Sequence, residues 1–216
     1  MPRRVLITGI TGFAGSHLAE RLVARGDEVH GIAHEPPPHE YLAAVAGRVQ
    51  LHESDVLDPH GLRAAVERAR PELVYHLAGQ AVPTLATADP LAAISVNVVG
   101  TSNVAEALEA APEAHLVAAS SADVYGMPDR SPVSEDAPLR PTNVYAATKV
   151  AAEAVLCYLG RRGRRVTILR PSNQIGPRQH PRLAASEFAH RIAEAEAGRA
   201  EPVISHGQLE PRREFV

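Results

Sequence analysis

Tyr145 and Lys149 stand four residues apart in "NVYAATKVAAEAV", residues 143–155, and Lys149 is the only lysine among the 22 basic residues of the chain. Positions i and i+4 share one face of a helix, so the ammonium is expected near the phenol. A free phenol has a pKa of ~10 and is a poor acid or base at neutral pH, but a neighbouring cation favours the phenolate. The pair predicts proton transfer by Tyr145, in a place where an arginine fork would have the wrong shape.

A hydroxyl that could hold a substrate oxygen follows a predicted strand. The stretch "LVAASSADVYG", residues 116–126, ends that strand in Ser120 and Ser121. We expect Ser121 to donate a hydrogen bond to a carbonyl or alkoxide oxygen while Tyr145 exchanges the proton.

A glycine-rich turn lies close to the N-terminus. "VLITGITGFAGSHLAERL" places Gly9, Gly12 and Gly15 between a short apolar run and an amphipathic helix. Glycines allow a tight turn and a close backbone approach, and the helix N-terminus offers N–H groups to a pyrophosphate. The spacing is GxxGxxG rather than the standard GxGxxG, and we predict a dinucleotide site here.

Further cofactor contacts are predicted at the ends of other strands. Asp55 in "HESDVLD" could accept from an adenine amino group, whereas Asp58 before Pro59 suits a helix N-cap. The small residues of "HLAGQA", residues 76–81, could let a flat cofactor lie across the carboxyl edge of a sheet.

The choice of dinucleotide depends on the end of the second predicted strand, "GIAHE". Ala33 stands where an acid would bind the ribose hydroxyls of NAD, and His34 could meet a 2′-phosphate. NADP(H) is therefore favoured and NAD(H) remains possible, because Glu35 argues in the opposite direction.

Short β-branched runs alternate with alanine-rich helical stretches, which predicts an α/β fold, a Rossmann-type doubly wound parallel sheet with right-handed crossovers. The predicted strands are 4–8, 28–33, 49–52, 73–76, 115–119 and 165–169. The predicted helices are 13–25, 59–68, 91–111 and 143–159.

The rhythm changes after Pro171, where a helix at 183–197 and a strand at 202–206 are predicted. We therefore expect a dinucleotide-binding domain over 1–170 and the start of a smaller substrate-binding domain over 171–216. The chain stops at "RREFV" without a closing element, so this second part is expected to be incomplete.

Composition excludes several classes of function. The net charge of −3 suggests neither a nucleic-acid face nor a polybasic membrane anchor. The 11 histidines show no metal-ligand spacing, so no metal is predicted. Cys157 is the only cysteine, excludes an internal disulfide and is expected to be buried in a helix. No apolar run approaches ~20 residues, and a soluble cytoplasmic protein is expected.

Six motifs together resemble the extended short-chain dehydrogenase/reductase superfamily, in its nucleotide-sugar branch. They are "TGITGFAG", "HLAGQA", "NVVGT", "SSADVYG", "YAATK" and "RPSNQIGPRQ", and they span almost the whole chain. The resemblance implies that Ser121, Tyr145 and Lys149 form a catalytic triad. It also implies that Asn97 organises a proton-relay water.

Within that branch the chain is most similar to the GDP-6-deoxy-4-keto-mannose reductases, and the related GDP-mannose 4,6-dehydratases resemble it too. The dehydratases carry Glu where this chain has Asp123, so an acid or base for elimination and a supporting role in the loop both stay open there. The resemblance also implies that Asn173, Arg191 and Arg213 approach the nucleotide sugar, although "RPSN" and "NQIGPRQ" depart from the reductase pattern.

The residues predicted to bind the cofactor, from the motifs and the resemblance together, are Gly9, Thr11, Gly12, Phe13, Gly15, His34, Asp55, Val56, Leu77, Ala78, Gly79, Tyr145, Lys149 and Pro171.

The predicted function is NAD(P)H-dependent reduction of a 4-keto nucleotide-diphosphate sugar, with a GDP-linked sugar favoured. Two alternatives stay open: a 4,6-dehydratase or 4-epimerase with tightly held NAD, and a non-catalytic dinucleotide sensor. The long helical pattern at 91–111 pairs in dimers of the family that the chain resembles, which implies a homodimer.

Overall fold

The computed structural model describes residues 2–35, 37–128, 131–206 and 214–215. The chain divides into two compact units, Met1–Arg170 and Pro171–Val216. The first unit contains one parallel sheet of six strands in the order β3-β2-β1-β4-β5-β6. The strands are β1 (Arg4–Thr8), β2 (Glu28–Ala33), β3 (Val49–Glu53), β4 (Leu73–His76), β5 (His115–Ala119) and β6 (Val166–Leu169).

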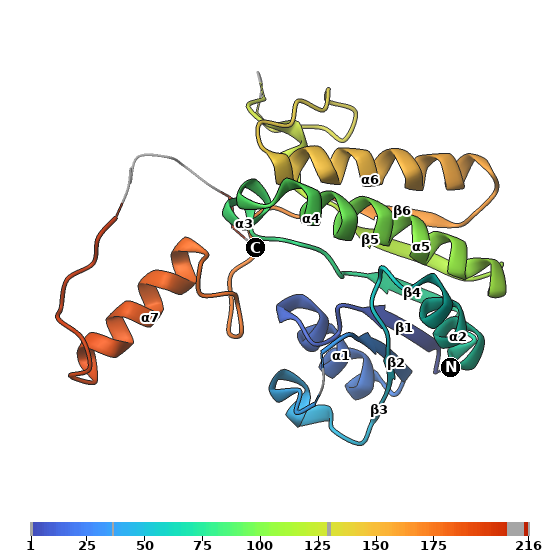
Figure 1. Cartoon of the computed structure of the whole chain (residues 1–216), viewed down its shortest axis with the longest axis horizontal. Coiled ribbons are helices and arrows are strands. Elements are labelled where there is room, and N and C mark those ends of the chain that lie inside the picture. The colour runs from blue at the N-terminus through green and yellow to red at the C-terminus, as the bar shows by residue number, and fades with distance from the viewer. Residues whose placement is uncertain (1, 36, 129–130, 207–213, 216) are drawn as a thin grey trace. The chain divides into compact units, whose positions relative to one another are not determined.

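Helices cover both faces of this sheet (Figure 1). They are α1 (Phe13–Arg25), η1 (Glu40–Val45), α2 (Pro59–Ala69), α3 (Pro83–Ala88), α4 (Pro90–Ile94), η2 (Ser95–Val99), α5 (Gly100–Ala107), η3 (Leu108–Ala110), η4 (Ala122–Tyr125) and α6 (Val144–Arg161). The predicted fold class, a doubly wound parallel α/β sheet, is confirmed.

Two apolar clusters, one on each face, follow from the alternation of side chains along the strands. Val5 and Ile7 of β1 pack with α1 and η1, whereas Leu6, between them in sequence, packs with α2, α5 and α6. Both faces are apolar because both are covered, as expected for a parallel sheet. Packing on both faces holds the sheet in place, and its carboxyl edge carries the residues of the candidate site.

Local signals set several helix ends as predicted. Asp58 caps α2 by accepting a hydrogen bond from the His60 N–H, with Pro59 in the first turn. Asn143 caps α6 by accepting from the Ala146 N–H at 2.8 Å. The cap on α6 fixes where that helix starts, and hence which face carries Tyr145 and Lys149.

The single helix predicted at 91–111 is divided into four segments. One of them, η2, is a π-helical turn, and Thr101 in α5 donates to the Asn97 carbonyl at 2.6 Å. Pro90–Ala110 is long and apolar enough by composition to cross a membrane, which the sequence prediction missed, but 44% of its apolar window is buried inside the unit. Its segments contact α2 and α6 within the first unit.

Two other predictions were wrong. Residues 202–206 form no strand and are exposed, because in the described chain they have no neighbouring strand to pair with. The described part of the second unit contains helix α7 (Ala184–Glu196) and a β-bridge between Asn173 and Phe215. Cys157 is exposed on α6, because the buried stripe of that helix passes through Ala152, Glu153 and Leu156.

Candidate active site

The residues predicted to do chemistry converge at the carboxyl edge of the sheet. Gly9 follows β1, His34 follows β2, Leu77 follows β4, and Ser120 follows β5. Parallel strands bring these ends to one side, where open α/β sheets bind their ligands.

The glycine loop is packed too tightly for larger residues. Gly9 has a φ of +71°, and a Cβ on it would lie 2.7 Å from the Ala78 nitrogen. A Cβ on Gly15 would lie 2.1 Å from the Gly9 carbonyl oxygen. Gly9 therefore lets the loop pack closely against the end of β4, and Gly15 lets the start of α1 approach Gly9. Gly12 is exposed at the start of α1.

The N-terminus of α1 offers N–H groups to an anion. Its N-cap is Gly12, no side chain caps the first turn, and no acidic residue lies in that turn. A helix N-terminus of this kind favours a phosphate group through its N–H groups and its dipole. The residues present thus fit the pyrophosphate of a dinucleotide.

Tyr145, Ser121 and Lys149 lie together at the carboxyl edge, where Lys149 approaches the loop that follows β4. Tyr145 is 8% exposed, and its phenol forms a hydrogen bond with Ser121. The Lys149 Nζ lies 5.9 Å from the centroid of the Tyr145 ring and donates to the Ala119 carbonyl at 2.9 Å. The Ser121 Oγ also accepts from the Asp123 N–H at 3.2 Å, which helps to fix the hydroxyl beside the phenol.

Burial dominates the electrostatics of the pair, which differs from the expectation that the ammonium would lower the phenol pKa. Desolvation raises the pKa of Tyr145; the Ser121 hydrogen bond acts against this and the charge of Asp123 acts with it. Desolvation also lowers the pKa of Lys149 to about 8, and Glu153 partly opposes this shift. Lys149 thus titrates close to neutral pH.

Asn97 organises the loop that follows β4. It is 1% exposed; its Oδ1 accepts from the Gln80 N–H at 2.8 Å, and its Nδ2 donates to the Thr148 hydroxyl at 2.8 Å. A Cβ on Gly79 would lie 2.8 Å from Asn97 Oδ1 and 3.5 Å from Lys149 Nζ. The loop therefore passes close against both side chains, and the relay role of Asn97 stays a prediction.

Asn97 is held by a buried chain of hydrogen bonds that the sequence did not predict. His76 is buried; its Nδ1 lies 2.8 Å from the Thr8 hydroxyl and its Nε2 lies 3.0 Å from the Thr101 hydroxyl. Because Thr101 donates its proton to the Asn97 carbonyl, it must accept from His76, so the ring proton is on Nε2. Burial, aided by the charge of Lys149, lowers the pKa of His76 to about 3, and the ring is neutral.

A second unpredicted feature is the ion pair of Glu153 and Arg170. Glu153 lies one helical turn after Lys149 on α6 and is 3% exposed. The signal in the sequence was a glutamate at positions i+4 from Lys149 and i+8 from Tyr145, on the buried stripe of an alanine-rich helix.

The residues predicted to contact the adenosine end lie at the rim of the edge. His34 and Glu35 are exposed and form a pair with 3.8 Å between His34 Nε2 and Glu35 Oε1. Asp55 is exposed and accepts from the Leu57 N–H at 2.8 Å, while Val56 is buried in the core. The Phe13 ring makes an edge contact with His17 at a centroid distance of 5.5 Å, and Thr11 precedes it in the loop. Their roles in binding stay predictions.

The remaining predicted site residues lie in both units. Asp123, predicted as a catalytic residue, is exposed in η4 of the first unit. Asn173 donates to the Glu214 carbonyl at 3.0 Å, and Arg191 pairs with Glu187 on α7 at 2.8 Å, both within the second unit. Pro171 opens that unit, and Arg213 lies outside the described residues. Their roles also stay predictions.

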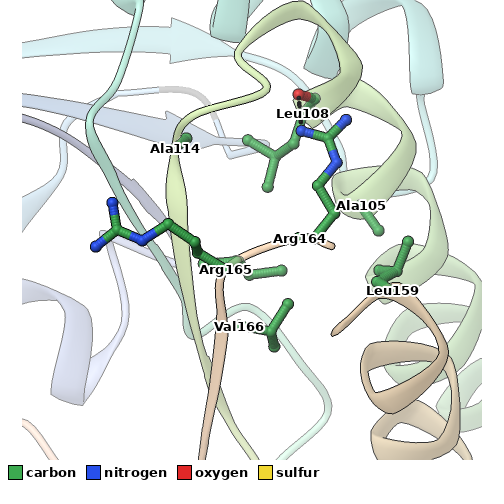
Figure 2. Close-up of a pocket in the computed structure, with 8 residues that line it drawn as sticks. Ala105, Leu108, Ala114, Leu159, Arg164, Arg165 and Val166 are labelled. Atoms are coloured by element: carbon green, nitrogen blue, oxygen red, sulfur yellow. Dashed lines mark hydrogen bonds between the residues drawn. The ribbon is translucent and has the colours of Figure 1, made fainter. Parts of the chain in front are cut away.

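One enclosed pocket lies elsewhere (Figure 2). It has a volume of about 10 Å³ and is lined by Leu108, Leu116, Leu159, Arg164 and Val166 among others, at the amino end of β5 and β6. Arg164 donates to the Leu108 carbonyl at 3.1 Å across its rim. A space of this size holds one water at most, so it is no ligand site. In the part of the chain that the structure describes, no group of His, Cys, Asp or Glu could hold a metal.

Comparison with known proteins places this geometry in a family. Residues 5–216 match the model of the "NAD dependent epimerase/dehydratase family". The chain is 32% identical over 220 residues to the GDP-6-deoxy-D-mannose reductase of Pseudomonas aeruginosa, covering 100% of this chain and 67% of that protein.

Two solved structures are also similar. The UDP-glucose 4-epimerase of Thermus thermophilus in complex with NAD is 35% identical, with a TM-score of 0.81 over 90% of this chain and 63% of that one. RMD from Pseudomonas aeruginosa complexed with NADPH is 32% identical, with a TM-score of 0.82 over 100% of this chain and 68% of that one.

The chain spans between 44% and 67% of the length of the curated relatives that it matches. The resemblance to extended short-chain dehydrogenase/reductases of the nucleotide-sugar branch, stated from six motifs, is confirmed. On the match of its family model across nearly the whole chain, this protein belongs to the NAD dependent epimerase/dehydratase family.

Proposed function

We propose that this chain carries the cofactor site and the proton-transfer residues of an NAD(P)-dependent enzyme that modifies nucleotide sugars. The observation that carries the proposal is that Ser121, Tyr145 and Lys149 are grouped at the carboxyl edge of the sheet, the same edge at which the uncapped N-terminus of α1 lies. The finer proposal is reduction of a 4-keto nucleotide-diphosphate sugar of the GDP-4-keto-6-deoxy-mannose type, in keeping with the similarity to a GDP-6-deoxy-D-mannose reductase.

The chain's own residues would hold the cofactor and move one proton. A bound nicotinamide dinucleotide supplies or accepts the hydride. The N-terminus of α1 binds its pyrophosphate. Ser121 donates a hydrogen bond to the oxygen on the reacting sugar carbon, and Tyr145 gives its phenolic proton to that oxygen as negative charge develops. Lys149 supplies a positive charge that stabilises the resulting phenolate.

A 4-epimerase or a 4,6-dehydratase is the second candidate. The similarity to a UDP-glucose 4-epimerase in complex with NAD supports the first of these. Asp123 supports the second, because its carboxylate acts on the pKa of Tyr145 and so lies near the reacting centre. Both reactions regenerate the cofactor within one turnover, whereas a reductase consumes it. A sensor without catalysis is disfavoured by the grouping of the three catalytic candidates.

Cofactor retention and consumption separate these candidates. The purified protein should be examined by mass spectrometry for bound dinucleotide. It should then be assayed with GDP-, UDP- and dTDP-linked sugars, as 4-keto sugars with added NADPH or NADH and as 4-hydroxy sugars without added cofactor. A reductase oxidises free cofactor in proportion to product. Co-purified NAD with conversion of the sugar and no net oxidation would instead establish the epimerase or dehydratase reading.

For the cofactor we propose NADP(H), because Ala33 leaves no carboxylate at the end of β2 and His34 is exposed beside it. Changing Ala33→Asp should shift the ratio of NADPH to NADH dissociation constants toward NADH by about tenfold or more, since a carboxylate repels the 2′-phosphate and accepts from the ribose hydroxyls. Fluorescence titration of both cofactors measures this ratio. Ala33→Asn, which has the same size without the charge, is the control. A wild type that already prefers NADH strongly would show that Glu35 sets the specificity.

We also propose a homodimer of a cytoplasmic protein. Leu91 on α4 and Tyr158 on α6 are 76% and 59% exposed, although both helices belong to the layers that cover the sheet. Exposed apolar side chains on neighbouring helices are typical of a subunit interface. Sedimentation equilibrium should give twice the monomer mass, and Leu91→Glu should lower the dimer fraction. A monomeric wild type at concentrations used for assay would contradict the proposal.

A further inference from the structure

A buried carboxylate lies directly behind the candidate catalytic residues. The Glu153 side chain is 4% exposed and makes three polar contacts. The Ser120 hydroxyl donates to its Oε1. Arg170, at the end of β6, donates from Nε to Oε1 at 2.9 Å and from Nη2 to Oε2 at 2.7 Å. The carboxylate is thus held by a bidentate guanidinium and a hydroxyl, and its geometry is fixed.

Arg170 extends these contacts to two further segments. Its Nη1 donates to the Tyr125 phenol oxygen at 2.7 Å and to the Glu135 carbonyl at 2.8 Å. The guanidinium also lies 5.0 Å from the centroid of the Tyr125 ring. Tyr125 ends the η4 turn that starts just after Ser121, and Glu135 lies in the segment that leads back to α6.

Each of these partners is adjacent to a candidate catalytic residue. Ser120 directly precedes Ser121, and Glu153 lies one turn from Lys149 on the same helix face. The segment formed by the β5 end and η4 meets α6 at this ion pair, although the two are well separated in sequence. A change in this pair therefore alters the relative positions of Ser121 and Lys149.

We propose that Glu153, paired with Arg170, is a positioning residue: it fixes Ser120 and thereby Ser121, and it places a negative charge one helical turn from the Lys149 ammonium. The inference rests on the proposed function only where turnover is concerned, because the effect on Lys149 is a property of the chain itself. Glu153 touches no predicted substrate or cofactor atom, so it acts through its neighbours.

The charge of Glu153 is already felt at Lys149. The groups that face Lys149 are Tyr145 and Glu153 on α6 and His76 from β4, with Arg170 behind Glu153 and Asp123 beside Tyr145. Burial lowers the pKa of Lys149 to about 8, and Glu153 raises it. Removing the carboxylate should lower the Lys149 pKa further, so the ammonium would be lost at a lower pH than in the wild type.

The experiment uses the fact that Lys149 is the only lysine in these 216 residues. Protein labelled with ¹³C at the lysine Cε gives one lysine side-chain signal, and its shift is followed against pH in the absence of substrate and cofactor. The wild-type midpoint is expected near 8, and Glu153→Gln should lower it. Glu67→Gln, the same change in the exposed Arg63 pair on α2, is the matched control and should leave the midpoint unchanged.

A second variant separates charge from position. Glu153→Asp keeps the carboxylate but is one carbon too short to hold Ser120 and Arg170 together, so the Lys149 midpoint should stay near that of the wild type while kcat falls by up to about a hundredfold. This variant also serves if Glu153→Gln does not fold. A midpoint unmoved in Glu153→Gln, or a wild-type kcat in Glu153→Asp, would overturn the inference. A wild type that turns over no nucleotide sugar counts against the proposed function alone, because the titration still reports on Glu153.

Discussion

Replacing Tyr145 with Phe should lower kcat by about 10²- to 10⁴-fold, the usual contribution of a positioned general acid or base. The variant loses one oxygen atom, which is the proton donor to the sugar oxygen in the proposed reaction. Dinucleotide affinity should stay at the wild-type value, because the glycine loop and the N-terminus of α1 hold the pyrophosphate. Steady-state kinetics and fluorescence titration of the cofactor check the two halves of this expectation.

Tyr125→Phe provides the matched control for the loss of a phenol oxygen near the site. Tyr125 accepts from Arg170 and lies outside the Ser121, Tyr145 and Lys149 group. It should cost kcat far less than Tyr145→Phe does. If Tyr145→Phe lost cofactor affinity as well as turnover, Tyr145 would be a structural residue and the assignment of the proton donor would be wrong.

Replacing Lys149 with Arg should lower kcat/KM by at least tenfold, or ~1.4 kcal/mol in the barrier. The positive charge is retained, but the wider guanidinium does not fit the space between Gly79 and the Ala119 carbonyl. The pH dependence should change too: the wild-type ammonium titrates near 8, so activity that requires it is lost as the pH rises through that value. The guanidinium of the variant stays charged, so the activity of the variant should not fall as the pH rises through that value.

The control for Lys149→Arg is the fold itself. Circular dichroism should match the wild type, because the substitution keeps charge and helix propensity, while the larger guanidinium should lower the melting temperature by only a few degrees, about 2–4 °C per kcal/mol. A variant with the wild-type rate and the wild-type fall in activity at alkaline pH would show that Lys149 has no special role. The single lysine among 21 arginines would then need a different explanation.

The strands and most helices were predictable because their signals are local. Short β-branched and apolar runs predicted β1, β2, β4 and β5 with their observed bounds, and Asp58 with Pro59 predicted the start of α2. The helix at 91–111 was predicted as one piece because a π-helical turn does not interrupt the apolar period. The strand at 202–206 was wrong because strand formation depends on a neighbouring strand, which the composition of a segment does not reveal.

The candidate site was predictable only where residue types are specialised. Tyr145, Lys149, Ser121 and the glycines carry chemistry or conformational freedom that few other residues supply. His76 and Glu153 were missed because each acts through partners distant in sequence: Thr101 for His76 and Arg170 for Glu153. Buried polar side chains of this kind become visible only when the fold shows which hydrogen bonds they make.

The sequence also did not predict the direction in which the pKa of Tyr145 is shifted. The spacing of Tyr145 and Lys149 suggested a lowered phenol pKa, but the depth of burial decides the sign, and burial raises it. A buried, protonated phenol suits a proton donor in the reductive direction.

The central claim, reduction of a 4-keto nucleotide sugar by a nicotinamide dinucleotide, is tested most directly by isotope transfer. The protein is incubated with NADPH or NADH carrying deuterium at both nicotinamide C4 positions and with GDP-4-keto-6-deoxy-mannose, and the products are analysed by mass spectrometry. We expect one deuterium at C4 of the product sugar and one oxidised cofactor for each molecule formed, with none in Tyr145→Phe. A protein that binds the dinucleotide tightly but transfers no deuterium to this sugar, or to its UDP- and dTDP-linked counterparts, would contradict the claim.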